Sequence, residues 1–286
     1  MKIAFLIMAY KNPDQIARLV RTMKHPSFDF YIHVDAKFDL APFEYIAEEE
    51  QVYFTRTRRK IYWAAFRFTQ TIVECAEDIL NNKQYDFISL ISGQDYPIKP
   101  IEEIAEHYNQ HLGASFFSLV DEDDTWWDHA ITRINKYHMT NYDFKGRYLL
   151  QRFLNATLPN RKLPVFKTLY GGPRATWWTV SSDCMRYIIQ FMKENKKLIR
   201  FSKFTWAPDE FLIPTIVMNS DFRDSVIKDS GVYIDWSQGG SNPKVLTIED
   251  YPQLKKSDKL TARKFDTRVD TEILDRIDKE LLKTEN

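Results

Sequence analysis

Glu210 is the acidic residue whose surroundings best suit a general base. It lies in the segment 206–212 (WAPDEFL), between apolar residues at the start of an expected helix. Partial burial would raise the pKa of its carboxyl group toward the range in which a base works at neutral pH, whereas the helix terminus would lower it. An acid at a helix start can also serve only to complement the helix dipole, and the sequence leaves both interpretations open.

Arg263 and Lys264 are the cations that could bind the phosphate oxygens of a ligand. They stand shortly before the closing helix, in the segment 262–266 (ARKFD). A forked guanidinium and a compact ammonium together suit a diphosphate, although a charge cluster in such a place is more often only part of the surface. The alternative way to neutralise a diphosphate is a divalent ion held by carboxylates.

Three aspartates could contribute to such an ion site. Asp121 and Asp123 form a D-x-D pattern after an expected strand, but they belong to a run of four acids, which is typical of a solvated loop. Asp95 follows the apolar strand 87–91 and has no acidic partner nearby in the sequence. It could therefore either bind a ligand or cap the turn before Pro97.

Histidines and nucleotide-binding motifs offer weaker signals. His107 and His111 are spaced i,i+4 without an apparent third ligand, so a metal role is the less favoured interpretation, and His33 is expected in or beside a strand. The sequence has no G-x-S-x-G, P-loop or G-x-G-x-x-G pattern, which argues against hydrolases, ATPases and dinucleotide-binding enzymes.

Composition indicates a globular protein with no strong global field. Lys plus Arg and Asp plus Glu both number 40 in 286 residues, so we expect no nucleic-acid partner. The two cysteines, Cys75 and Cys184, predict a reducing compartment and hence a cytoplasmic location. Residues 1–10 resemble a signal peptide, but they run directly into a helix cap and are expected to form a first strand. No apolar run approaches the length of a membrane span.

The elements that must position these residues alternate between strands and helices. Asn12, Pro13 and Gln15 predict an N-cap and the first turn of a helix after the opening strand. Strands are expected at 3–9, 28–34, 51–55, 87–91, 114–120 and 177–181, and helices after 12 and at 41–50, 64–81, 182–192, 210–218 and 270–282, whereas 130–168 is mixed and basic. This alternation predicts a mostly parallel sheet with both faces covered and a ligand site at the carboxyl ends of its strands.

Five patches in this order resemble one enzyme family. They are residues 3–21, 31–35 (YIHVD), 87–98 (FISLISGQDYPI), 208–210 (PDE) and 262–266 (ARKFD). Together they are similar to the core-2/I-branching β-1,6-N-acetylglucosaminyltransferases and peptide O-xylosyltransferases of glycosyltransferase family 14. Asp235-Trp236 and the following Ser-Asn-Pro look most like the xylosyltransferase branch, and the resemblance extends from residue 3 to about 282.

The resemblance implies a GT-A-like, Rossmann-related α/β fold whose mostly parallel central sheet is flanked by helices. One domain would span 1–286, with a nucleotide-binding half at 1–113 and an acceptor or catalytic half at 114–286. The implied enzyme is inverting, takes a UDP-sugar donor without a metal or other cofactor, and uses Glu210 as base. The implied substrate contacts are Met8, Ala9 and Tyr10 for the nucleoside, Asp35 near the uridine, Arg263 and Lys264 for the diphosphate, Asp95 in place of a metal-binding DxD, and Asp235 and Trp236 for sugar or acceptor.

Departures from the family leave several points open. Tyr10 stands where the family has a histidine, and Ala64-Ala65 replaces glycines after Trp63, so the donor could carry GlcNAc or xylose. Residues 121–165, with Trp126 and Trp127, match poorly and assign no acceptor. The chain resembles a bacterial, cytosolic version without anchor or disulfides. We expect a glycan or lipid-linked glycan acceptor and loose association with the inner membrane. A metal-dependent GT-A transferase and a non-catalytic carbohydrate-binding protein remain alternatives.

Overall fold

The apolar run near the N-terminus forms strand β1 (Ile3–Ala9), which lies at the centre of the main sheet. The structure is a computed structural model that describes residues 1–283. β1 pairs in parallel with β2 (Phe28–Val34) on one side and β4 (Phe87–Ser92) on the other. All seven residues of β1 are buried, as expected for a strand covered on both faces.

The main sheet has the strand order β3-β2-β1-β4-β7-β6-β8. Its outer strands are β3 (Val52–Phe54), β7 (Thr179–Ser181), β6 (Ser115–Phe116) and β8 (Val226–Ile227). The predicted mostly parallel α/β sheet is confirmed, but β7 runs antiparallel to both β4 and β6. The strand expected over 114–120 is reduced to the two residues of β6, since the chain after Phe116 leaves the sheet toward the site described below.

A second, three-stranded sheet has the order β5-β10-β9. Its strands are β5 (Asp95–Pro97), β10 (Thr261–Arg263) and β9 (Val232–Ile234). It joins the turn after β4 to the C-terminal part of the chain, because Arg263 pairs with Asp95 across β5 and β10.

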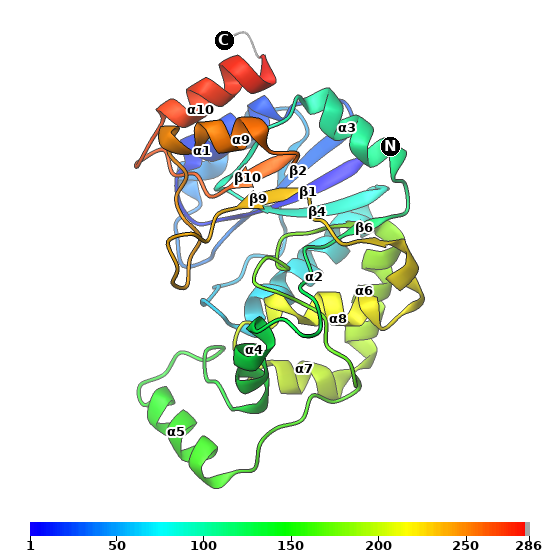
Figure 1. Cartoon of the computed structure of the whole chain (residues 1–286), viewed down its shortest axis with the longest axis vertical. Coiled ribbons are helices and arrows are strands. Elements are labelled where there is room, and N and C mark those ends of the chain that lie inside the picture. The colour runs from blue at the N-terminus through cyan, green and yellow to red at the C-terminus, as the bar shows by residue number, and fades with distance from the viewer. Residues whose placement is uncertain (284–286) are drawn as a thin grey trace.

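Helices cover both faces of the main sheet (Figure 1). They are α1 (Pro13–Thr22), α2 (Phe66–Asn82), α3 (Ile101–Gln110), α4 (Trp126–Asn135), α5 (Arg147–Thr157), α6 (Ser182–Glu194), α7 (Lys196–Ser202), α8 (Leu212–Met218), α9 (Tyr251–Lys256) and α10 (Glu272–Ile277). Shorter helical segments are η1 (Ala41–Glu48), η2 (Pro208–Glu210), η3 (Asp221–Ser225), η4 (Ile248–Asp250) and η5 (Asp278–Leu282). Helix α5 lies within the region 130–168, which is mixed and basic in the sequence, and α4 extends into it.

Asn12 and Pro13 take the predicted positions at the N-cap and the first turn of α1, but the N-cap lacks its usual side-chain hydrogen bond. Asn12 adopts a left-handed conformation (φ 52°) and its side chain does not cap the helix. Its amide donates instead to Asp266 (2.7 Å), and the amide of Gln15 donates to the carbonyl oxygens of Gly93 (2.9 Å) and Phe265 (3.1 Å). These polar residues therefore fasten α1 to the segment after β10, a long-range contact that local capping rules do not describe.

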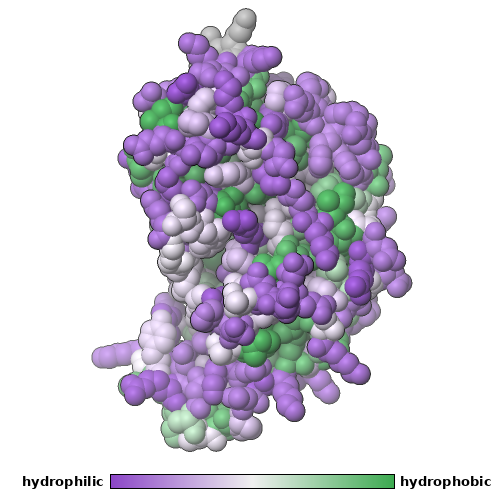
Figure 2. Space-filling view, viewed as in Figure 1, coloured by the Kyte–Doolittle hydropathy of each residue, from purple (hydrophilic) through white to green (hydrophobic). Residues whose placement is uncertain are grey.

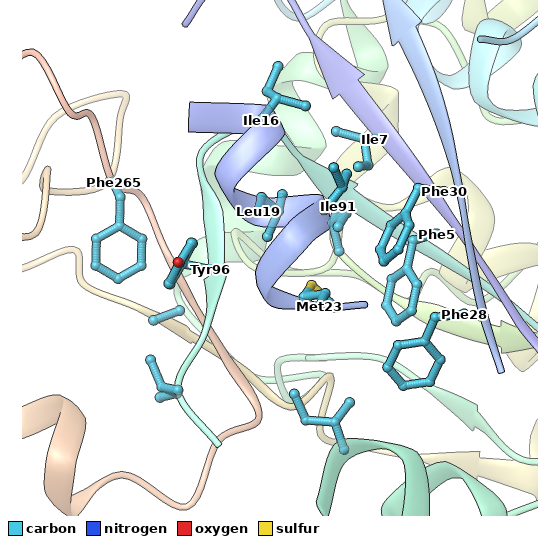
Figure 3. Packing of buried hydrophobic residues seen from close by; sticks show 14 of the residues in the cluster. Phe5, Ile7, Ile16, Leu19, Met23, Phe28, Phe30, Ile91, Tyr96 and Phe265 are labelled. Carbon is cyan, nitrogen blue, oxygen red and sulfur yellow. The ribbon is translucent and has the colours of Figure 1, made fainter. Parts of the chain in front are cut away.

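The core divides into two clusters because alternate residues of β1 point to opposite faces. Phe5 packs edge-on against Phe28 (5.1 Å between ring centroids) and stacks on Phe30 (5.6 Å) in the cluster under α1 (Figure 3). Leu6 contributes to the other cluster, under α2, α6 and α8. Burial on both faces of one strand holds the carboxyl ends of β1, β2 and β4 at a common edge of the sheet.

No helix within residues 1–283 is both long enough and apolar enough to cross a membrane. The division of the chain at residue 113 into a nucleotide-binding and an acceptor half stays a prediction.

Candidate active site

A cleft of about 1000 Å³ opens where the central strands end. The tail of β1 at Met8–Tyr10 and Asp35 after β2 form one part of its wall, and Arg263 and Lys264 form another. In the space-filling view a hollow separates the upper and lower halves of the molecule (Figure 2). Its other charged and aromatic lining residues are His33, Tyr62, Trp63, Phe68, Trp126, Arg133, Arg174, Trp177, Trp206, Asp209, Glu210 and Trp236.

Glu210 lies at the end of η2, with its side chain 20% exposed to the cleft. Burial raises the pKa of Glu210 to about 7, and the neighbouring carboxyl group of Asp209 adds to this rise. Arg133 from α4 donates to the Glu210 carboxylate (2.8 Å) and acts in the opposite direction. The burial that the sequence left open therefore outweighs the opposing effects, and Glu210 is close to half ionised at neutral pH.

Two glycines hold the backbone at Glu210 in place. Gly172 donates its N–H to the carbonyl oxygen of Glu210 (3.1 Å), and a Cβ atom at Gly171 would lie only 2.4 Å from the same oxygen. On the other side, Ala207 adopts a left-handed conformation (φ 49°) and donates its N–H to Ala64 (2.9 Å). The loop before Trp177 and the loop before α2 thus both clamp the segment that carries the acid.

Arg133 is held by an aromatic residue as well as by the acid. Its guanidinium lies over the ring of Trp206, 4.2 Å from the centroid, and Trp206 contacts Trp63 edge to face (4.9 Å). A guanidinium stacked on a tryptophan keeps its position with little loss of side-chain freedom. The carboxylate that it contacts is therefore presented in a defined orientation.

Arg263 is fixed by buried groups below the cleft. Its Nε donates to Asp95 (3.3 Å), one of its terminal nitrogens donates to the hydroxyl of Ser92 (3.3 Å), and its guanidinium lies 4.0 Å from the centroid of Trp177. Asp95 also accepts from the N–H and the hydroxyl of Ser92. It does not line the cleft, so the structure places Asp95 as a support for Arg263 and for the turn after β4.

Lys264 lines the same cleft. It makes no ion pair with any residue between 1 and 283. Burial lowers the pKa of Lys264, and the nearby charges of Arg263 and Lys11 lower it further, while Asp266 opposes them. A cation held next to other cations without a counter-ion is a place where a bound anion would lower the electrostatic energy.

The ends of β1 and β2 carry the residues expected to meet a nucleoside. Asp35 accepts from the N–H groups of Lys37 (2.9 Å) and Ile61 (3.2 Å). Tyr10 is exposed and its hydroxyl donates to Gln94 (3.2 Å). Both line the cleft, together with Met8 and Ala9.

Asp235 and Trp236 both line a smaller cavity, but only Trp236 also lines the main cleft. Trp236 lines the main cleft, and its indole N–H is buried and unpartnered among the described residues. Asp235 lines the smaller adjoining cavity of about 350 Å³ and accepts from the N–H of Ser237 (2.6 Å).

The remaining candidates lie elsewhere. Asp121 and Asp123 are exposed and do not line the cleft, whereas Trp126 does. His107 and His111 contact each other, with 4.8 Å between ring centroids. Between residues 1 and 283, no group of three His, Cys, Asp or Glu side chains could hold a metal ion.

The sequence predicted neither Arg133 nor Trp206 as site residues. Trp206 was visible as the first residue of the WAPDEFL segment, but Arg133 lies in the region expected to be irregular and belongs to no motif. Only the docking of α4 beside η2, 77 residues apart in the chain, shows that Arg133 meets Glu210.

Comparison with known proteins links the chain to one family. The profile described as "Core-2/I-Branching enzyme" matches residues 3–256. Xylosyltransferase sqv-6 of Caenorhabditis briggsae is 24% identical over 99% of this chain and 37% of its own length. Xylosyltransferase 1 of Rattus norvegicus is 20% identical over 97% of this chain and 35% of its own. The chain thus spans about a third of the length of the curated relatives it matches.

Solved structures give lower similarity. A 4-diphosphocytidyl-2C-methyl-D-erythritol synthase matches with a TM-score of 0.36 and 11% identity, over 73% of this chain and 91% of its own. A putative glucose-1-phosphate thymidylyltransferase from Bacillus anthracis, in complex with a sucrose, matches with a TM-score of 0.35 and 12% identity, over 71% and 85%.

The contact between Arg133 and Glu210 predicts how the acid titrates. Replacing Arg133 by Gln removes the positive charge that opposes burial, so the pKa of Glu210 is expected to rise above its value of about 7. A ¹³C NMR titration of the Glu210 carboxyl group measures this pKa directly. Arg152→Gln, on exposed α5, is the matched control and should leave it unchanged; an unaltered pKa in Arg133→Gln would show that the contact does not govern the acid.

Proposed function

The chain belongs to the Core-2/I-branching enzyme family, and we propose that it is an inverting glycosyltransferase that moves GlcNAc or xylose from a UDP-sugar to a glycan hydroxyl. It works without a divalent metal ion. The acceptor is a glycan or a lipid-linked glycan. The printed names of the relatives, xylosyltransferases of several animals, favour a transferase that uses a sugar donor of this kind.

One observation carries this proposal: a carboxylate poised near neutral pH shares a cleft with an unpaired cation. Glu210 has a pKa of about 7 and Lys264 has no ion-pair partner within residues 1–283. Transfer from a nucleotide sugar requires a base for the incoming hydroxyl and positive charge for the departing phosphate. The same cleft supplies both.

The reaction is a single displacement. Glu210 takes the proton of the acceptor hydroxyl while that oxygen forms a bond to the anomeric carbon. The bond between the anomeric carbon and the phosphate oxygen breaks at the same time, and its electron pair leaves with UDP. Because the acceptor enters opposite the departing group, the configuration at the anomeric carbon inverts.

Arg133 and Lys264 support opposite ends of this displacement. Arg133 orients the carboxylate of Glu210 and keeps its pKa from rising further. Lys264 and Arg263 stabilise the negative charge that grows on the diphosphate, and Arg263 is held rigid by Asp95 and Trp177. Cations fixed before the reaction need no reorganisation as the charge develops.

Loss of the base should remove transfer without removing the donor. Glu210→Gln keeps the shape of the side chain but cannot accept a proton, so turnover should fall by roughly 10² to 10⁴. UDP binding, measured by calorimetry, should remain close to that of the wild type. Glu103→Gln on α3 is the matched control, and near-normal transfer by Glu210→Gln would refute the assignment of the base.

The pH profile provides an independent check on the same group. Because the carboxylate form is the active one, kcat/KM should rise by about tenfold per pH unit below the pKa and level off above it. The bend is expected near the pKa of Glu210, about 7. A profile that is flat from about pH 5 to about pH 8 would exclude Glu210 as the titrating base.

Removal of the unpaired cation should affect the donor instead. Lys264→Ala should weaken UDP binding by about tenfold to a hundredfold, as expected for loss of a charge-assisted contact. Lys279→Ala on the exposed face of η5 is the control. Transfer with UDP-GlcNAc and UDP-xylose should continue in EDTA; a strict requirement for Mn²⁺ would overturn metal independence and return attention to Asp121 and Asp123.

A further inference from the structure

Helix α5 exposes apolar side chains to an unusual degree. Tyr148, Leu149 and Phe153 are 58%, 70% and 63% exposed, and α5 contains no buried residue. The helix projects at the end of the molecule opposite α10 (Figure 1), and hydrophobic atoms appear at that end in the space-filling view (Figure 2). Large apolar side chains gathered on one projecting helix mark an interaction surface.

The polar side of α5 faces the protein. The amide of Asn155 accepts from the N–H of Tyr137 (2.7 Å) and donates to its carbonyl oxygen (2.8 Å), and Gln151 accepts from the N–H of Met139 (2.9 Å). A surface helix normally turns its apolar side inward. Here hydrogen bonds hold the helix in the reverse orientation, which leaves its apolar side free to enter another apolar phase.

The charge on α5 and in the segment after it is positive, although Asp143, just before the helix, pairs with Arg147 (3.3 Å). Residues 144–167 contain Lys145, Arg147, Arg152, Arg161, Lys162 and Lys167 but no Asp or Glu, in a chain whose net charge is zero. Arg161 is buried and donates to the carbonyl oxygens of Lys136 and Phe204. Arg147 is committed to Asp143 and to the carbonyl oxygen of Tyr142 (2.6 Å), and the other four cations are exposed at the surface.

We propose that this surface, formed by Lys145, Tyr148, Leu149, Arg152 and Phe153, docks onto an anionic lipid bilayer. The leucine and aromatic side chains enter the boundary between headgroups and acyl chains, while the arginine and lysine side chains meet lipid phosphates. The inference does not depend on the proposed function, because none of these residues lines the cleft.

Two other occupants fit less well. A symmetric contact with a second copy of the chain would place the same cations opposite one another, and like charges repel. A soluble acidic polymer would satisfy the cations but would leave Leu149 and Phe153 in water. An anionic bilayer alone matches both the charge and the apolar side chains.

Docking through α5 would also orient the cleft. The segment that joins α4 to α5 is fastened at the cleft wall, since Asn141 accepts from the N–H of Arg67 (2.9 Å) and Thr140 donates to the carbonyl oxygen of Ala64 (3.2 Å). Arg133 lies on α4, directly before this segment. A membrane under α5 would therefore lie on the same side of the molecule as the helix that contacts Glu210.

Co-sedimentation of the full chain with lipid vesicles tests the proposal. Vesicles of equal parts phosphatidylglycerol and phosphatidylcholine should bind the protein, and pure phosphatidylcholine vesicles should not. Added NaCl should weaken the binding. The double variant Leu149→Ser/Phe153→Ser should partition onto the anionic vesicles at least about tenfold more weakly. Val269→Ser, which changes another exposed apolar side chain (62% exposed), is the control and should bind as the wild type does.

Unchanged thermal unfolding and UDP binding would show that the double variant is folded. The proposal is overturned if the wild type ignores the anionic vesicles or if the double variant binds them equally well. Binding to a soluble acidic polysaccharide that needs Arg152 but not Leu149 or Phe153 would assign the surface to such a polymer instead. A dimer in light scattering that Leu149→Ser/Phe153→Ser dissociates, without vesicle binding, would assign it to a second copy.

Discussion

The contact between a partly buried carboxylate and a single guanidinium governs the proposed chemistry of this protein. Burial and the neighbouring carboxyl group of Asp209 raise the pKa of Glu210, whereas the guanidinium of Arg133 lowers it. Arg133 at 2.8 Å opposes part of this rise, and the pKa is about 7. The hydrogen bond from the Gly172 N–H to the backbone of Glu210 and the stacking of Arg133 on Trp206 hold this contact in place.

Arg263 and Lys264, the neighbouring cations of the cleft, have different roles. Arg263 is committed to Asp95 and Ser92 and stacks on Trp177, so it is rigid but partly neutralised. Lys264, its neighbour in the chain, makes no ion pair within residues 1–283, so its ammonium group can meet a bound anion. The buried carboxylate of Asp95 holds Arg263 in β10. Because Lys264 directly follows Arg263, this contact also fixes the position from which Lys264 reaches the cleft. The second sheet exists at this point because β5 and β10 pair Asp95 with Arg263.

Helix α5, at the bottom of the molecule in Figure 1, is held in place differently from the strands of the main sheet. Along β1, alternate apolar residues enter two cores, and all seven residues of the strand are buried. At α5, amide side chains such as Asn155 hold the helix while Leu149 stays in solvent. The first arrangement makes a rigid frame for chemistry, whereas the second prepares a surface for a partner. The hydrogen bonds distinguish the two arrangements, since each buried backbone group must be paired.

The sequence by itself determined the alternation of strands and helices in the first third, the parallel sheet edge and the acid at 210. These features depend on local periodicity and on the residues that directly follow each strand. Only the tertiary structure decided the antiparallel course of β7, the helix α4 in a basic region, and the tie from Asn12 to Asp266. Each of these depends on residues far apart in the chain. Local sequence patterns do not predict such contacts, because the packing energy depends on which distant residues meet in the folded chain.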